Sequence, residues 1–315
     1  MKEAVIVSTA RTPIGMVFRG ALNNIKSPTM MGHALRHAID RSGVEDGEIE
    51  DIIVGTVLAA GTAGMNVARL SSFAAGLLET VPAQTIDRQC SSGLMAIAMA
   101  ARQIVVEGQD VVVAGGQDNI SAVQNQYFQW VTDEKDPAAI AHAEHAYMPM
   151  LLTAEHVAKT YDISREQQDA YAAESQTRTA AGQGAGRFDD EIVPITATRA
   201  VKNKETGEVT HEEVTLSKDE GNRPGTTAGT LAGLNPVIEG GCITAGNASQ
   251  LSDGASACVL MERSVAEKRG IEPLGIYRGT AVAGNAPEEM GIGPVYAIPK
   301  LLDRHGLKID DIDLW

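Results

Sequence analysis

The 315-residue sequence lacks the features that define several classes of protein. It has only three cysteines, Cys90, Cys242 and Cys258, and no Cys-x-x-Cys pair. An odd number of cysteines without that spacing argues against a disulfide scaffold and indicates a reducing compartment. No apolar run approaches the length of a membrane-spanning helix, and the run at 4–8 is too short for a signal peptide before Arg11 interrupts it. These absences predict a cytoplasmic protein.

Positive charge is also scarce. The sequence contains 26 lysines and arginines against 41 aspartates and glutamates, which gives a formal net charge of -15. A protein with this balance repels phosphate backbones and anionic headgroups, so we expect neither a nucleic acid nor a membrane as partner. An anionic ligand would need basic groups gathered at its site.

Short apolar segments alternate with helical patterns over the first third of the chain. Unbroken apolar runs at 4–8, 51–54 and 111–116 are typical of strands buried on both faces of a sheet. Helical patterns cover 29–42 and 66–78, the second with an asparagine at its start. Alternation of this kind predicts an α/β fold with a parallel sheet covered by helices on both faces.

The pattern becomes less regular after Gln117. A helical region over 154–182 includes a well-capped start at Ser164, and the charged stretch 199–223 predicts a loop. We interpret residues 119–249 as a large excursion from the sheet, of the kind that carries ligand contacts.

The sheet pattern returns at 257–261, with a short helix at 264–269. Within the excursion, His142 and His145 form an isolated His-x-x-His pair, which is more often a solvated helix face than a metal site. No metal site is therefore expected. We predict four parts: a first α/β half (1–118), an inserted loop domain (119–249), a return to the first half (250–270) and the start of a second α/β half (271–315).

An internal echo supports the two halves. Residues 34–44 return as 297–307, with an alanine, an aspartate, an arginine and a glycine matching at a constant offset. A strand at 274–281 would then correspond to the strand at 4–8. On this interpretation the second half stops inside its second strand at Trp315, and either a longer chain or a second chain supplies the remainder.

Cys90 lies where a predicted strand turns into a helix. The apolar positions after it recur at helical spacing and end at Gly108. Unpaired backbone N–H groups and the positive end of the helix dipole would meet at Cys90, which favours a nucleophilic thiolate. A buried core cysteine is the alternative, but its polar neighbours disfavour it. Cys242 and Cys258 have no such neighbours, and we expect them to be structural.

Five motifs in order carry a resemblance that spans the chain. They are Arg-Thr-Pro-Ile-Gly at 11–15, Asp-Arg-Gln-Cys-Ser-Ser-Gly at 87–93, Gly-Arg-Phe-Asp-Asp-Glu-Ile-Val-Pro at 186–194, Thr-Ala-Gly-Asn-Ala-Ser at 244–249 and Met-Gly-Ile-Gly-Pro at 290–294. Together they resemble the thiolases, the family of acetyl-CoA acetyltransferases and 3-ketoacyl-CoA thiolases. The resemblance implies two pseudo-symmetric α/β halves with mixed, mostly parallel sheets and a loop domain inserted in the first half.

The resemblance also implies a function. Cys90 would take the acyl group of an acyl-CoA or a 3-ketoacyl-CoA as a thioester, which splits one transfer into two exchanges. The reaction would be a reversible Claisen condensation of acyl-CoA with acetyl-CoA, or thiolysis of a 3-ketoacyl-CoA in fatty acid metabolism. Coenzyme A would be substrate or product, with no covalently bound cofactor.

Further positions follow from the same resemblance. Arg223 and Thr226 lie where the family contacts the adenine of coenzyme A, and the segment that begins at Leu231 departs from the lysine and arginine found there in some members. Ala248 and Ser249 match positions that line the pantetheine channel. Met150 and Met290 would shape the acyl pocket, and core packing is the alternative role for each of these two methionines.

The family's other catalytic motifs, Asn-Glu-Ala-Phe, Gly-His-Pro and Cys-x-Gly, do not occur in these 315 residues. We therefore expect the isolated chain to be inactive. The alternatives are a ketosynthase-type condensing enzyme, which shares the fold and the cysteine, and a non-catalytic or partner-dependent thiolase-like subunit. By analogy with the family, a homodimer or homotetramer is expected, with a separate chain completing the second half as a further alternative.

Overall fold

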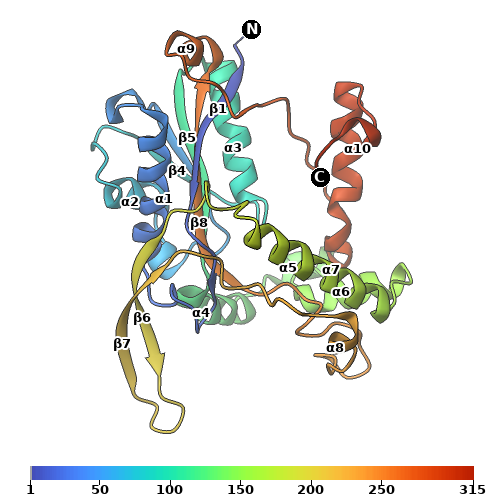
Figure 1. Ribbon diagram of the computed structural model, residues 1–315. Coiled ribbons are helices and arrows are strands. Elements are labelled where there is room, and N and C mark those ends of the chain that lie inside the picture. Colours follow the sequence, from blue (N-terminus) through green and yellow to red (C-terminus); the bar gives the residue numbers. More distant parts are fainter. Residues whose placement is uncertain (1) are drawn as a thin grey trace. The chain divides into compact units, whose positions relative to one another are not determined.

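The computed structural model describes residues 2–315, which form two compact units. Of the described residues, the first unit comprises 2–129, 186–222 and 251–277, and the second comprises 130–185, 223–250 and 278–315 (Figure 1). The prediction of four parts with boundaries at 118, 249 and 270 stays a prediction.

The elements of the first unit are β1 (Ala4–Arg11), β2 (Gly15–Met16), α1 (Ser27–Ser42), η1 (Asp46–Glu48), β3 (Asp51–Gly55), η2 (Gly61–Ala63), α2 (Val67–Ala74), β4 (Ala83–Ile86), α3 (Ser92–Arg102), η3 (Gln103–Glu107), β5 (Val111–Asn119), β6 (Ile195–Lys202), β7 (Val209–Leu216), β8 (Ser252–Glu262), α9 (Arg263–Lys268) and β9 (Gly275–Ile276). α4 (Ile120–Asp133) runs from the first unit into the second. The second unit contains α5 (Pro137–His142), α6 (Met150–Thr160), α7 (Arg165–Gly184), α8 (Ala228–Ala232), η4 (Pro287–Ile292), α10 (Gly293–His305) and η5 (Ile309–Asp311).

The first unit is built on a seven-stranded sheet. Its strand order is β4-β3-β5-β8-β1-β9, and β2 pairs with β8. β3 runs parallel to β4 and β5, whereas β8 runs antiparallel to both β5 and β1. The sheet is therefore mixed, which confirms the α/β class and corrects the purely parallel sheet that alternation alone predicts. β8 follows the long excursion rather than a crossover helix, so the rule for parallel connections does not fix its direction.

Helices cover both faces of this sheet. Alternate residues of the central strands face opposite cores: Val111 and Val113 pack in the core that contains α1, while Val112 and Ala114 pack in the core that contains α3. Figure 1 shows α1 and α2 on one side of the strands and α3 on the other. Because both faces are buried, the central strands have continuous apolar runs, as the sequence predicts.

Several predicted elements are confirmed, with shifted ends. The side chain of Asn66 accepts the amide of Arg69 and so caps α2, but this helix ends at Ala74, four residues earlier than predicted. The helical region predicted over 154–182 is two helices, α6 and α7, separated by a turn in which Asp162 has a φ of 52°. Ser164 forms the predicted capping box at the start of α7.

The charged stretch at 199–223 is not a loop throughout. β6 and β7 pair in an antiparallel hairpin in which Arg199 lies opposite Glu212. Ile195 and Ala197 of β6 and Leu216 of β7 are buried, but the residues nearer the turn are exposed or half-buried, so the stretch from 199 onwards has little apolar alternation to reveal a strand. The hairpin is stabilised by backbone pairing and cross-strand contacts, which charge composition does not report.

The internal echo is confirmed as repeated local structure. α1 ends at Gly43 with a φ of 67° and α10 ends at Gly306 with a φ of 63°, and each is followed by a short 3-10 helix. The strand predicted at 274–281 is wrong in extent, because only Gly275–Ile276 is a strand and it pairs with β1 in the first sheet. The predicted strand at 314–315 is likewise not a strand in the structure.

The helices were compared with the length and apolar character of a membrane-spanning segment. Over residues 2–315, none of them combines the length and the apolar character that a crossing would require.

Candidate functional site

The turn between β4 and α3 presents Cys90 at the protein surface. The amides of Ser91 and Ser92 donate to the carbonyls of Arg88 and Gln89 at 3.2 and 2.9 Å, which winds the chain into the first turn of the helix. The buried hydroxyl of Ser92 donates to the carbonyl of Gln89 and accepts the amide of Arg88. Cys90 itself is exposed. The predicted position at a helix N-terminus is therefore confirmed.

The approach of α3 to the sheet requires glycine at the ends of two strands. A Cβ atom at Gly55, the last residue of β3, would lie 2.2 Å from the carbonyl carbon of Ser92. A Cβ atom at Gly116 of β5 would lie 3.0 Å from the Cα atom of Gly93. Because none of these glycines carries a side chain, the start of α3 rests directly on the strand backbones. This contact fixes Cys90 beside the carboxyl ends of β3 and β5.

A cavity of about 350 Å³ lies against Cys90 within the first unit. Its walls come from three places: the start of α3, the carboxyl-terminal parts of β3 and β5, and the start of β8 together with the chain from the end of β1 to β2. The lining residues are Arg11, Ile14, Gly55, Gln89, Cys90, Ser92, Gly93, Gly116, Gln117, Asp118, Ser252, Gly254, Ala255 and Ser256. A volume of this size accommodates a small acyl group beside the sulfur.

Asp118 is the acidic group in the wall of this cavity. Its carboxylate accepts hydrogen bonds from the hydroxyl of Thr56 at 3.1 Å and from the amides of Val57 and Leu58 at 3.0 and 3.3 Å. Burial raises its pKa, although these donors act in the opposite direction. The side-chain amide of the buried Gln117 donates to the same Thr56 hydroxyl. The network holds the chain after β3 in place next to the nucleophile.

Arg11 anchors the opposite wall. Its guanidinium donates to Glu191 at 2.7 Å and to both carboxylate oxygens of Asp219 at 2.8 and 3.1 Å. Asp219 in turn accepts the amide of Ile14 at 2.7 Å. Burial would raise the pKa of Asp219, but Arg11 and the Ile14 amide lower it overall. The arginine of the 11–15 motif therefore positions Ile14 rather than an anionic ligand.

The two other cysteines differ from Cys90. Cys258 lies in the core beside α3, and burial raises its pKa to about 12. Cys242 belongs to the second unit, where its thiol donates to Glu155 at 3.2 Å and its pKa is raised by burial and by that carboxylate. Both are poor nucleophiles at neutral pH, as expected for structural cysteines.

The seven other predicted site residues all belong to the second unit. Arg223 is exposed and Thr226 is half-buried, and both precede α8. Leu231 is a buried residue of α8, while Ala248 and Ser249 are exposed at the end of the segment 244–249. The amide of Ala248 donates to the carbonyl of Thr244 at 3.0 Å. The structure thus brings the predicted coenzyme A residues into one unit.

Met150 and Met290 lie on elements that pack against each other. Met150 is the first residue of α6 and Met290 belongs to η4, and both side chains are about half exposed. The contacts between these elements involve the other end of α6, where the hydroxyl of Tyr161 donates to Glu289 at 3.0 Å. Exposure argues against the core-packing alternative, and a shared acyl pocket stays a prediction.

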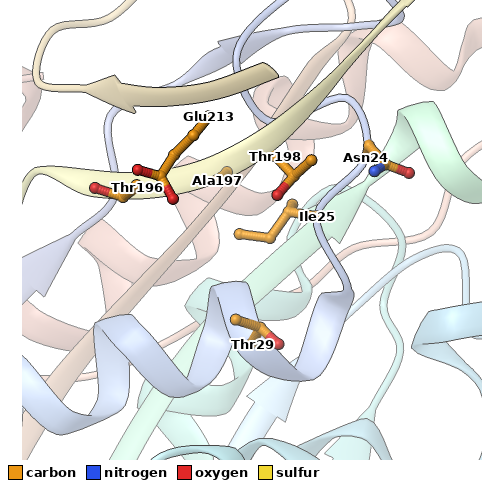
Figure 2. Close-up of a pocket in the computed structure, with 7 residues that line it drawn as sticks. All are labelled: Asn24, Ile25, Thr29, Thr196, Ala197, Thr198 and Glu213. Carbon is orange, nitrogen blue, oxygen red and sulfur yellow. The ribbon is translucent and has the colours of Figure 1, made fainter. Parts of the chain in front are cut away.

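A second cavity, of about 420 Å³, lies elsewhere in the first unit. Figure 2 shows its residues on α1, on the chain that leads into it and on the hairpin strands: Asn24, Ile25, Thr29, Thr196, Ala197, Thr198 and Glu213. Its only charged group is the carboxylate of Glu213. A cavity with this charge is unsuited to the phosphates of coenzyme A.

No cluster of three or more histidine, cysteine or acidic side chains suitable for a metal ion occurs among residues 2–315. The walls of the Cys90 cavity, which include Gln117, Asp118 and four residues at the start of β8, were not predicted from the sequence. Glycines at the ends of two predicted strands, Gly55 and Gly116, were the available signal. No sequence pattern indicated that β8 would line this cavity, because its place between β1 and β5 follows from the tertiary fold.

Comparison with known proteins assigns the class. The thiolase N-terminal domain family model matches residues 4–264, and the thiolase C-terminal domain family model matches residues 271–315. The chain belongs to the thiolase family.

Individual relatives support the same assignment. The chain is 42% identical to a 3-ketoacyl-CoA thiolase of Bacillus subtilis, with 100% of this chain and 80% of the relative covered. It is 40% identical to the peroxisomal 3-ketoacyl-CoA thiolase 2 of Arabidopsis thaliana, over 99% of this chain and 67% of the relative. The crystal structure of the Bacillus anthracis acetyl-CoA acetyltransferase superposes with a TM-score of 0.86 at 38% identity, covering 100% of this chain and 79% of that one.

These matches identify the function as that of a thiolase. They give no support to the expectation that the isolated chain is inactive, because the relatives match it from end to end.

Proposed function

We propose that Cys90 is the acyl acceptor of a thiolase that transfers acyl groups to and from coenzyme A. The observation that carries this proposal is an exposed thiol at the N-terminus of α3, open to a cavity of about 350 Å³. The backbone N–H groups of a helix start stabilise a thiolate, and the small residues around it let a thioester approach.

The first exchange follows from this arrangement. The Cys90 thiolate attacks the carbonyl carbon of an acyl-CoA, and a tetrahedral intermediate forms with negative charge on the former carbonyl oxygen. As the intermediate collapses, the carbon–sulfur bond to coenzyme A breaks, and coenzyme A leaves as its thiolate. The acyl group remains as a thioester on Cys90. The backbone N–H of Cys90 is the proposed hydrogen-bond donor to the oxyanion.

The second exchange determines the direction. In condensation an acetyl-CoA loses a proton from its methyl carbon, the resulting carbanion attacks the acyl-cysteine, and the proton balances the coenzyme A thiolate released in the first exchange. In thiolysis the thiolate of free coenzyme A attacks instead, and Cys90 leaves as the thiolate in both cases. The names of the relatives support 3-ketoacyl-CoA and acetyl-CoA as substrates. Coenzyme A is the proposed substrate or product, with no covalently bound cofactor.

The proposed contacts with coenzyme A lie in the second unit. Arg223 and Thr226 are assigned to the adenine end, Ala248 and Ser249 to the pantetheine, and Leu231 to the segment where some members of the family have a lysine and an arginine. Arg223, exposed just ahead of α8, offers a cation to an anionic ligand in a chain whose net charge is -15. Met150 and Met290 are assigned to the acyl chain.

The test is covalent labelling of the purified chain with acetyl-CoA, followed by peptide mass spectrometry. We expect one acetyl group on Cys90 of the parent chain and none in the Cys90→Ser variant. Hydroxylamine, which cleaves thioesters, should remove the acetyl group from the parent chain. Acetylation without a carrier protein also distinguishes a thiolase from a ketosynthase-type condensing enzyme. An unmodified Cys90, or labelling that survives the substitution, would overturn the proposal.

Turnover is measured separately as thiolysis of acetoacetyl-CoA. The three motifs absent from these 315 residues led to the expectation of no turnover, which thiolysis by the isolated chain would refute while leaving the assignment of Cys90 in place. If turnover appears only when a second protein co-purifies, the partner-dependent alternative gains support.

Assembly and location are proposed on narrower grounds. A cytoplasmic location agrees with three free cysteines and with the bacterial relative, and a homodimer or homotetramer is proposed by analogy with the family. Several other relatives are named as peroxisomal. Size-exclusion chromatography with light scattering measures the assembly.

A further inference from the structure

Helix α7 of the second unit (Figure 1) makes hydrogen bonds to the three segments that carry Arg223, Leu231 and Ala248. Its residues Arg165, Asp169 and Gln176 bond to these segments, and spacings of four and seven residues place all three on one face of the helix. Gln176 accepts the backbone amide of Arg223 at 2.8 Å. This contact fixes the chain at the start of the proposed adenine-binding segment.

Asp169 is the central group on this face. It is 2% exposed, and each of its carboxylate oxygens has a partner of its own. One accepts a hydrogen bond from Arg165 at 2.8 Å, and the other accepts one from the side-chain amide of Asn247 at 3.0 Å. A carboxylate bound on both sides in a buried site has little freedom to move, and removing either partner leaves a buried charge less satisfied.

The arginine extends the contact to α8. A second nitrogen of the Arg165 guanidinium donates to the carbonyls of Leu231 and Leu234 at 2.7 and 3.1 Å. The Leu231 carbonyl lies in the last turn of the short helix α8, where it also accepts the amide of Leu234 at 3.0 Å, and the Leu234 carbonyl lies just past the end of that helix. Asp169 therefore fixes the position of Leu231 through Arg165.

The asparagine extends the contact to the segment 244–249. Asn247 accepts the amide of Thr244 at 2.8 Å and donates to the carbonyl of Cys242 at 3.0 Å. Ala248 and Ser249 follow it directly. Asp169 therefore also fixes these two residues, through Asn247.

The two segments also touch each other. A Cβ atom at Gly246 would lie 2.5 Å from the side chains of both Leu231 and Leu234. The two segments therefore pack directly against each other, and Asp169 is linked to both of them through Arg165 and Asn247.

We propose that Asp169 is a positioning residue that holds Leu231 and the pair Ala248 and Ser249 in place relative to each other, and so keeps the segments that contact coenzyme A in their binding arrangement. Asp169 is buried behind both segments and acts through Arg165 and Asn247. This inference rests on the proposed function, since it takes the coenzyme A contacts from there.

The test compares the parent chain with Asp169→Asn and Arg165→Lys. The first removes the charge with little change in shape, and the second keeps a cation that lacks the guanidinium fork needed for three acceptors. We expect the dissociation constant of coenzyme A, measured by calorimetry, and the half-saturating acetyl-CoA concentration for Cys90 acetylation to rise about tenfold in both variants. The maximal rate of acetylation should stay within about twofold of the parent, because the substitutions do not reach the nucleophile.

Arg178→Gln is the matched control, since Arg178 lies on the same helix and forms an exposed ion pair with Glu174. Alkylation of Cys90 by iodoacetamide reports the nucleophile without coenzyme A and should be equal in all four proteins. Unchanged affinity in both folded variants, or equal weakening in the control, would overturn the inference. If the parent chain binds coenzyme A but is not acetylated, the proposed function fails, and calorimetry still tests the role of Asp169.

Discussion

At the scale of single residues, the environment of each sulfur atom decides which cysteine can react. Cys90 is exposed beside a cavity, whereas Cys258 is enclosed by apolar side chains. The thiol of Cys242 donates a hydrogen bond to Glu155. The three residues are chemically identical in the sequence. Polar neighbours separated Cys90 from the others in advance, because a run of polar side chains is rarely buried.

Thiol reactivity tests this ranking. We expect iodoacetamide to alkylate Cys90 in the native protein and Cys258 only after unfolding, because burial raises the pKa of Cys258 to about 12 and excludes the reagent. Peptide mapping after a short exposure at neutral pH measures both sites. The Cys90→Ala variant is the control, and fast alkylation of Cys258 in it would contradict the expectation.

At the scale of elements, caps and close contacts define where the helices begin and how they pack. Sequence patterns located α1, α2, α3 and the start of α7, because capping side chains and apolar periodicity are local signals. They missed the β6–β7 hairpin, because most of its residues near the turn are charged or polar and only its base carries buried apolar residues.

The capping box of α7 provides a test at this scale. Ser164 accepts the amide of Gln167, and the side chain of Gln167 accepts the amide of Ser164. Ser164→Ala should reduce the free energy of unfolding by about 1 kcal/mol. Urea denaturation measures the difference, with Ser175→Ala in the exposed middle of the same helix as control. Equal loss in both variants would show that the cap contributes nothing of its own.

The packing of α1 predicts a dependence on pH. Burial and the neighbouring charge of His37 lower the pKa of His33 from its ordinary value of 6.5, although the carbonyls of Val193 and Pro194 act in the opposite direction. Below about pH 6.5 the unfolded chain binds a proton at this site more readily than the folded one. The contribution of His33 to the free energy of unfolding is therefore fully present above that pH, and it decreases as the pH falls towards the lowered pKa.

Urea denaturation between pH 5 and 8 measures this effect, with the range chosen to span the histidine titration of about 6.5. The His33→Gln variant should lose less stability on acidification than the parent chain. His211→Gln, at an exposed position of β7, is the matched control and should follow the parent. A steeper acid loss in His33→Gln would contradict the assignment.

At the scale of the whole molecule, the order of strands determines which distant segments share a site. β8 inserts between β5 and β1 and brings residues 252–256 to the cavity at Cys90. The repeated pattern of helix, left-handed glycine and 3-10 helix in α1 and α10 shows that the internal echo in the sequence encodes local structure. It did not specify strand pairing, since β9 joins the first sheet.

The sequence by itself determined the α/β class, the buried strands, most helix starts and the presentation of Cys90, because apolar periodicity, caps and turn residues act over a few positions. Only the tertiary structure decided the antiparallel insertion of β8, the anchoring of Ile14 by Arg11 and Asp219, and the attachment of the segments at 231 and 247 to α7 through Asp169. These features join residues far apart in the chain. Their free energy comes from contacts that exist only after folding, and no local pattern records them.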